Sequence, residues 1–143
     1  MARIRKATRV PIACGENVYT RYGFRPFIEK QAVSIIQPDM AKTGGLLETR
    51  KIAAMAETYM IPIAPHGMAS PLGQQAYAHV CATVPNFMIL EWGPYFFEPL
   101  NKVVKRPEVK NGFLDVPEGP GIGAELNQDA IQEALLPGYT LPA

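Results

Sequence analysis

Four side chains capable of acid–base or metal chemistry are spaced almost evenly along the first 91 residues: Glu16, Asp39, His66 and Glu91. Successive members are 23 (16 to 39), 27 (39 to 66) and 25 (66 to 91) residues apart. An imidazole exchanges protons near neutral pH, and carboxylates orient an imidazole or bind hard divalent cations. The set therefore predicts proton-transfer chemistry, with a divalent metal ion as the candidate cofactor.

Asp39 and His66 are predicted to act together. If they end neighbouring strands, the carboxylate accepts a hydrogen bond from one ring nitrogen, which fixes the tautomer and raises the basicity of the other nitrogen. His66 would then be a general base. The alternative is that Asp39 caps a helix and that His66 is held structurally in a loop. His79, in a predicted helix, is expected to be structural.

The two glutamates have different expected roles. Glu16 lies in a Gly-Glu-Asn turn after an apolar segment and is a candidate ligand for Mg²⁺, which proteins bind through carboxylates, water and substrate. Glu91 precedes Trp92, and we expect a partly desolvated, protonated carboxyl that donates to a developing oxyanion. The alternatives are a solvated loop carboxylate for Glu16 and an ordinary carboxylate at the edge of the core for Glu91.

A short apolar segment precedes each of these four residues. The segments 9–14, 33–37, 61–64 and 87–90 are predicted to be buried strands that end where the sequence turns polar. Because the carboxyl ends of parallel strands face one side, the four polar residues are expected to converge.

Three helices are predicted between the strands. The clearest period runs over 45–60, with one packed face made of Ile52, Met55, Ala56 and Tyr59. A second helix starts at Ser70 and Pro71 and continues to 84, with a packed face made of Leu72, Ala76, Val80 and Thr83. Residues 23–31 predict a shorter helix, with Pro26 in its first turn, where proline is tolerated.

This alternation predicts an α/β fold with a parallel sheet covered by helices. The even spacing favours a barrel wall of four β/α units. A closed (β/α)₈ barrel needs about 250 residues, and this chain, with 143, is too short for one. A Rossmann-type sheet is the rival, but no glycine-rich fingerprint follows a strand and opens a helix. Half of a (β/α)₈ barrel is therefore the predicted architecture.

Proline and glycine become frequent after Glu91, so little regular structure is expected there. We divide the chain into a barrel half, 1–95, and a C-terminal extension, 96–143, that packs on the barrel or on a capping domain. Apolar residues at 103–104 and 113–116 predict short strands or a hairpin, and 127–136 predict a short terminal helix.

Composition limits the kinds of partner. The chain has 14 basic and 13 acidic residues without clustering, so no surface for nucleic acid is expected. No apolar run is long enough to span a membrane and no signal peptide is evident, which makes the cytoplasm the default location. Cys14 and Cys81 are expected to be buried thiols, with one disulfide as the alternative. A small molecule or another protein is the expected partner.

Several strings in the chain are more specific than its composition. They are Pro-Ile-Ala-Cys-Gly-Glu-Asn (11–17), Ile-Ile-Gln-Pro-Asp (35–39) with Thr-Gly-Gly-Leu-Leu-Glu-Thr-Arg-Lys-Ile-Ala (43–53), Ile-Ala-Pro-His (63–66) and Pro-Asn-Phe-Met-Ile-Leu-Glu-Trp (85–92). With them the chain resembles the mandelate racemase/muconate lactonizing group of the enolase superfamily, most of all its acid-sugar (aldonate or galactonate) dehydratases. The resemblance covers essentially the whole chain and implies the C-terminal half of the barrel, strands five to eight.

The resemblance also implies roles. Glu16 corresponds to a ligand of Mg²⁺, His66 and Asp39 to a base with its orienting carboxylate, and Glu91 to an acid beside an enediolate. The implied reaction removes the proton α to a substrate carboxylate, and loss of the β-hydroxyl then gives a 2-keto-3-deoxy acid. Reprotonation instead would make the protein a racemase or epimerase. Substrate contacts are expected at Asn17, Gly67, Met68 and Trp92.

Parts of the family pattern have no counterpart in this sequence: further metal-ligand carboxylates, a second acid/base residue and a capping domain. Met1 resembles an internal family position, so we expect a truncated chain, or a piece of a longer homo-oligomeric enzyme, that is inactive alone. One carboxylate should bind Mg²⁺ weakly. The competing possibility is a non-catalytic half-barrel that covers its open edges by pairing with a second copy.

Overall fold

The four predicted strand segments lie in parallel order in the computed structural model, which describes residues 1–93 and 98–140. Strand β1 (Ala13–Cys14) pairs with β2 (Ile35–Ile36). Single parallel bridges join Ile36 to Ile63 and Ile63 to Phe87, which adds the third and fourth segments in chain order. This is the arrangement expected of successive β/α units.

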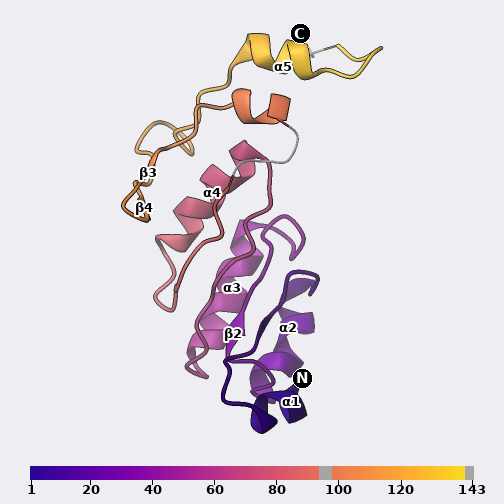
Figure 1. Ribbon diagram of the computed structural model, residues 1–143, viewed down its shortest axis with the longest axis vertical. Coiled ribbons are helices and arrows are strands. Elements are labelled where there is room, and N and C mark those ends of the chain that lie inside the picture. The colour runs from indigo at the N-terminus through magenta and orange to yellow at the C-terminus, as the bar shows by residue number, and fades with distance from the viewer. Residues whose placement is uncertain (94–97, 141–143) are drawn as a thin grey trace. The chain divides into compact units, whose positions relative to one another are not determined.

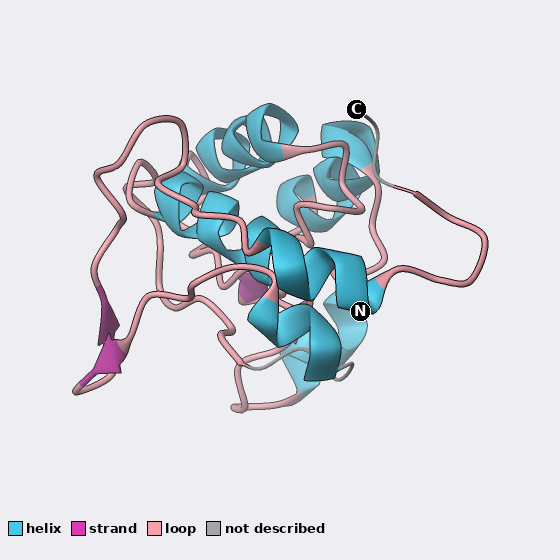
Figure 2. Ribbon diagram, turned by 90° about the horizontal axis from the view of Figure 1, so that it is seen from above, coloured by secondary structure: helices cyan, strands magenta, loops and turns pink. Residues whose placement is uncertain are grey.

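Regular strand structure is shorter than the segments 9–14, 33–37, 61–64 and 87–90 predict, and most of the path between helices is loop (Figure 2). Prolines are the reason, since they have no N–H to donate to a neighbouring strand. The carbonyls of Pro38, Pro62 and Pro65 still accept, from the backbone N–H of His66, Ile36 and Glu91 respectively. The pairing therefore continues past the short strands, and Ala64 N–H and Met88 N–H return bonds to the carbonyls of Ile36 and Ile63.

Helices α2 (Thr20–Glu29) and α3 (Leu46–Glu57) pack against each other (Figure 1). Their buried side chains and those of the strand segments form one apolar core: Phe24, Ile28, Val33, Ile36, Ile52, Ala53, Ala56, Ile61 and Ile63. Of the face predicted for 45–60, Ile52 and Ala56 are buried, whereas Tyr59 lies beyond the end of α3 and is exposed.

The predicted position of Pro26 is wrong. Helix α2 begins at Thr20 rather than at 23, so Pro26 lies in the helix interior instead of the first turn. A proline there removes the bond that would reach the Tyr22 carbonyl. Phe24 and Ile28 are almost fully buried on either side of it in the chain, and their packing holds the helix together despite the missing bond.

The chain forms two compact units, Met1–Gly67 with Val80–Glu91 and Met68–His79 with Trp92–Ala143. The first contains helix α1 (Ala2–Ala7), β1, α2, β2 and α3. The second contains most of α4 (Pro71–Cys81), a 3-10 helix η1 (Glu98–Lys102) and α5 (Gln128–Ala134). The predicted boundary between 95 and 96 falls among residues 94–97, outside the described part, so the division into 1–95 and 96–143 stays a prediction.

Helix α4 starts as predicted, because the Ser70 hydroxyl accepts from the Gly73 N–H ahead of Pro71. Its predicted packed face is only partly right: Val80 is buried, whereas Leu72 and Thr83 are exposed. The other buried side chains of the helix include Gln74, Gln75, Tyr77, Ala78 and Cys81. Polar partners make this possible: Gln74 accepts from Arg106, and Gln75 donates to the Lys105 carbonyl.

The extension contains the predicted hairpin, but with its first strand shifted from 103–104. Strand β3 (Val109–Lys110) pairs antiparallel with β4 (Phe113–Leu114). Asn111 and Gly112 both have positive φ, as a tight two-residue turn requires. Helix α5 follows Asn127, whose side chain accepts from the Ala130 N–H as an N-cap.

Cys14 and Cys81 are free thiols, and only Cys81 is buried. Burial raises the pKa of Cys81 to about 12, and it also raises the pKa of Cys14. Among the described residues, no helix is both long and apolar enough to cross a membrane.

Cys81 is expected to resist alkylation while the protein is folded. The thiolate is the reactive form, and at about pH 8.5 a thiol with this pKa is roughly one part in 3,000 ionised. Iodoacetamide labelling followed by peptide mass mapping should therefore modify Cys14 at least about tenfold faster than Cys81. The difference should vanish in denaturant, and equal labelling rates of the two thiols in the folded protein would contradict the burial of Cys81.

Candidate active site

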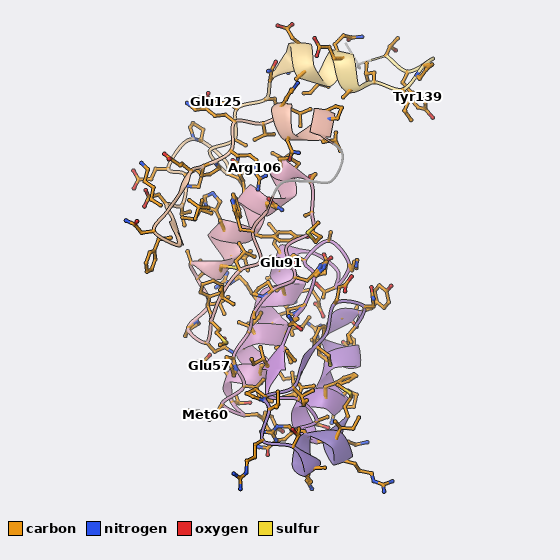
Figure 3. The ribbon with its side chains drawn as sticks, viewed as in Figure 1. Glu57, Met60, Glu91, Arg106, Glu125 and Tyr139 are labelled. Atoms are coloured by element: carbon orange, nitrogen blue, oxygen red, sulfur yellow. The ribbon has the colours of Figure 1, made fainter. Side chains whose placement is uncertain are left out.

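The strand ends of the first unit bring Glu16, Asp39, His66 and Glu91 together. His66 Nδ1 lies 2.9 Å from Asp39 Oδ2. His66 Nε2 lies 3.6 Å from Glu16 Oε1 and 3.7 Å from Glu91 Oε2. Figure 3 shows Glu91 at the opposite end of this unit from Met60, which follows α3. The imidazole thus has a carboxylate oxygen near each ring nitrogen.

Asp39 is positioned by the strands and by a turn. It forms a parallel bridge with His66, and its side chain is 3% exposed. Ala41 N–H donates to Asp39 Oδ1, and the Asp39 carbonyl accepts from the N–H of Lys42 and Thr43. Asp39 therefore holds a turn and contacts His66 as well, whereas the helix cap that the sequence left as the alternative is not formed, because the N-cap of α3 is Gly45.

His66 has the arrangement of an oriented imidazole, with its side chain 18% exposed. When Nδ1 donates to the Asp39 carboxylate, the lone pair of the neutral ring lies on Nε2. That nitrogen is the one near Glu16 and Glu91. A proton taken up at Nε2 would be stabilised by these two carboxylates.

Glu91 does not lie in the desolvated position that the sequence predicts. Its side chain is 52% exposed, and the preceding Met88 and Ile89 are exposed as well. One oxygen is fixed, since Gly67 N–H donates to Glu91 Oε2 at 3.0 Å. Glu91 is therefore a solvated carboxylate with a defined position.

Gly67→Ala is expected to displace Glu91 and destabilise the protein. A Cβ at position 67 would overlap the Glu91 carbonyl oxygen, and backbone must then move. Overpacking of this kind costs about 1–3 kcal/mol, measurable by urea denaturation. Gly93→Ala is the matched control, because a Cβ at Gly93 meets nothing within 4 Å. Equal stability of the two variants would contradict the close approach.

Lys42 is a site residue that the sequence analysis missed. Its Nζ lies 2.8 Å from Glu16 Oε1, 3.2 Å from Asn17 Oδ1 and 3.6 Å from Asp39 Oδ2. The hydrogen bond from Lys42, with a smaller contribution from His66, lowers the pKa of the Glu16 carboxyl. The same bond raises the pKa of Lys42. The sequence feature that could have identified Lys42 is its position three residues after Asp39, about one turn along the chain.

The described residues do not fit a complete magnesium site. Within 1–93 and 98–140, no group of three or more His, Cys, Asp or Glu side chains is arranged to hold a metal ion. Glu16, the predicted ligand, is paired with the Lys42 ammonium. Both oxygens of Asp39 are engaged, by Ala41 and His66, and one oxygen of Glu91 is engaged by Gly67.

An open cavity of about 380 Å³ adjoins the site. Its polar lining comes from Glu16, His66 and Glu91 together with Gln37, which the sequence analysis also missed. Gln37 lies at the end of β2, where its N–H donates to the Cys14 carbonyl. Two apolar residues of the fourth segment, Ile89 and Leu90, also line the cavity.

The residues predicted to contact substrate differ in position. Asn17 accepts from Lys42, and Gly67 fixes Glu91, so both belong to the site in the first unit. Met68 and Trp92 fall in the second unit. There the Arg106 guanidinium stacks over the Trp92 ring at 5.1 Å. A substrate-binding role for these four residues stays a prediction.

Parallel strands joined by helices, with acid–base side chains at their carboxyl ends, define this chain as part of a (β/α) barrel domain. Residues 1–130 match the family model described as "Enolase C-terminal domain-like", and the chain belongs to that family. The predicted superfamily and the fold class, a partial barrel of the C-terminal domain, are thereby confirmed.

Three known proteins illustrate the similarity. A "D-xylonate dehydratase" of Haloferax volcanii is 42% identical over 139 residues, covering 96% of this chain and 34% of that protein. A "D-galactonate dehydratase" of Variovorax paradoxus is 32% identical over 139 residues, covering 92% and 36%. A crystal structure of a mandelate racemase/muconate lactonizing enzyme-like protein from Rubrobacter xylanophilus has a TM-score of 0.87 and 43% identity, covering 97% and 36%. The chain thus spans about a third of the length of its curated relatives.

Proposed function

We propose that this chain is the base-bearing part of a dehydratase that acts on acid sugars, with His66 as the general base. The observation that supports this most is the 2.9 Å contact between His66 Nδ1 and the buried Asp39 carboxylate. It leaves Nε2 beside an open cavity lined by Glu16 and Glu91. The names of two similar proteins, dehydratases of D-xylonate and D-galactonate, favour the substrate class.

In the proposed reaction, His66 Nε2 takes the proton from the carbon α to the substrate carboxylate. The electron pair of the broken C–H bond moves into the carboxylate and forms an enediolate. Collapse of the enediolate breaks the C–O bond at the β-carbon, and the hydroxyl leaves as water after taking up a proton. The enol that remains tautomerises to a 2-keto-3-deoxy acid. Substrate therefore equals product plus one water.

Asp39 and Glu91 support this step in different ways. Asp39 holds the imidazole so that the lone pair stays on Nε2, and it balances the charge of the imidazolium that forms. Glu91 is proposed as the acid beside the developing oxyanion, with one carboxylate oxygen held by Gly67 N–H. Because Glu91 is solvated, this role requires that it take up a proton once substrate covers the site.

The rest of the protein must supply positive charge. The site in this chain contains three carboxylates, Glu16, Asp39 and Glu91, and one ammonium, Lys42. An acid sugar is itself an anion and would be repelled by this set alone. Mg²⁺ belongs to the proposal for the whole protein through the family resemblance, but the described residues do not form its site. The activity therefore has to be tested on the complete protein.

Three apolar residues of the fourth segment are exposed, Phe87, Met88 and Ile89, as expected if the site needs further parts of a complete barrel. We propose that further barrel strands, from the same protein or from a second copy, cover them. Sedimentation of the 143-residue chain as a monomer at micromolar concentration would contradict coverage by a second copy.

The test is turnover of D-xylonate and D-galactonate by the complete protein with Mg²⁺. We expect a 2-keto-3-deoxy acid, detected as its semicarbazone, and deuterium exchange at the α-carbon in heavy water. Exchange with an epimeric product and no keto acid would show the racemase or epimerase chemistry instead. If a panel of acid sugars gives neither product nor exchange, proton abstraction is refuted as the function.

A further inference from the structure

Three side-chain oxygen atoms lie close to the Lys42 ammonium. An ammonium has three N–H donors, and the oxygens of Glu16, Asn17 and Asp39 lie 2.8, 3.2 and 3.6 Å from Nζ. Glu16 and Asn17 follow β1, whereas Asp39 follows β2. The lysine therefore joins two strand ends at the mouth of the sheet.

Local structure places Lys42 there. Met40, in the same turn, is almost fully buried, and the Lys42 and Thr43 N–H groups both donate to the Asp39 carbonyl. This anchors the backbone at position 42 directly beside Asp39. The Lys42 side chain, 36% exposed, then reaches across to Glu16, which is 47% exposed.

The position of this ammonium conflicts with Glu16 acting as a free metal ligand. Glu16 Oε1 accepts from Lys42 Nζ, and the same oxygen lies 3.6 Å from His66 Nε2. A divalent cation bound to Glu16 would lie close to the ammonium, and like charges at such distances repel each other. The lysine therefore opposes the binding of a metal ion to Glu16.

We propose that Lys42 is a built-in cation that competes with a divalent metal ion for Glu16. Without metal it holds the Glu16 carboxylate at the mouth, and its charge opposes a metal ion that binds the same carboxylate. By linkage the competition is reciprocal, so the ammonium lowers the affinity of the site for metal. The inference rests on the proposed function in one respect only, that the complete protein binds a divalent metal ion; Glu16 as one of its ligands is what the family resemblance implies.

The experiment measures binding of Mn²⁺ to the complete protein by electron paramagnetic resonance, without substrate. Lys42→Met keeps the length of the side chain and removes its charge. We expect the dissociation constant for Mn²⁺ to fall by about fivefold or more in this variant, because a competing charge is gone. Lys42→Arg keeps the charge and should stay within about twofold of the parent protein. Lys51→Met, at an exposed position of α3, is the matched control and should not change the constant.

A gain in affinity is informative because loss of a merely structural contact would weaken metal binding. Unchanged or weaker binding in Lys42→Met overturns the proposal. So does a gain that persists after Glu16→Gln is added, since the metal would then be bound elsewhere. Failure of the proposed function appears separately, as absence of acid-sugar turnover, which this measurement does not use.

Discussion

His66→Asn is expected to lower kcat for α-proton abstraction in the complete protein by about 10²–10⁴-fold. Asparagine retains a polar group near Asp39, but it has no nitrogen that takes up a proton near neutral pH. Dehydration and α-deuterium exchange should fall together, because both begin with the same broken C–H bond. Measuring both rates in heavy water separates this loss from a defect in a later step.

The second histidine provides a matched control. His79 Nε2 contacts the Ile122 carbonyl at 3.0 Å within the second unit, and no part of the proposed reaction uses it. His79→Asn should therefore leave the exchange rate within a few-fold of the parent protein. Full activity of His66→Asn, in a variant shown by circular dichroism to be folded, would refute the assigned base.

Asp39→Asn is expected to cause a loss of similar size, about 10²–10⁴-fold in kcat, although it does not touch the substrate. Ala41 N–H donates to Asp39 Oδ1, and His66 Nδ1–H donates to Asp39 Oδ2. An amide has only one oxygen, so one of these donors meets an NH₂ group in either orientation of the asparagine. If the imidazole gives way, its proton moves to Nε2 and the lone pair needed for proton abstraction is lost.

This prediction is tested by the pattern of the kinetic constants. A positioning role predicts a fall in kcat with a small change in KM, because the residue acts on the base and not on substrate. Asp115→Asn, at an exposed aspartate of the extension, is the matched control. Because Asp39 is buried, the melting temperature of each variant has to be recorded. Wild-type kcat in a folded Asp39→Asn variant would show that His66 does not depend on the carboxylate.

Lys42 bears on both results, because its Nζ lies 3.6 Å from the Asp39 oxygen that also contacts His66. Asp39→Asn removes the negative charge between lysine and histidine as well as the hydrogen-bond acceptor. The effects of changes at 39 and 42 are therefore not expected to add, since residues that share a partner couple. Only a double variant separates the two contributions.

Much of the site was predictable from the sequence because strand order and side-chain type are local properties. Apolar runs ending in polar residues located the four segments, and their spacing indicated parallel β/α units. Neighbouring parallel strands end at the same edge of a sheet, so contact between Asp39 and His66 was expected from the order of the strands. Short strings around these residues carried the resemblance to the family, which the match of residues 1–130 confirms.

Other features were decided by tertiary structure, because they depend on contacts between residues distant in sequence. The apolar segment before Glu91 predicted a partly desolvated carboxyl, but Met88 and Ile89 are exposed in the fold and the Glu91 side chain is 52% exposed. The buried face of α4 contains Gln74 and Gln75, whose partners are distant in sequence: Arg106 donates to Gln74, and the Lys105 carbonyl accepts from Gln75. The sequence alone indicated that Glu16, Asp39, His66 and Glu91 meet at the strand ends. The Lys42 bridge to Glu16 required the folded turn after β2, because only there does its ammonium reach the end of β1.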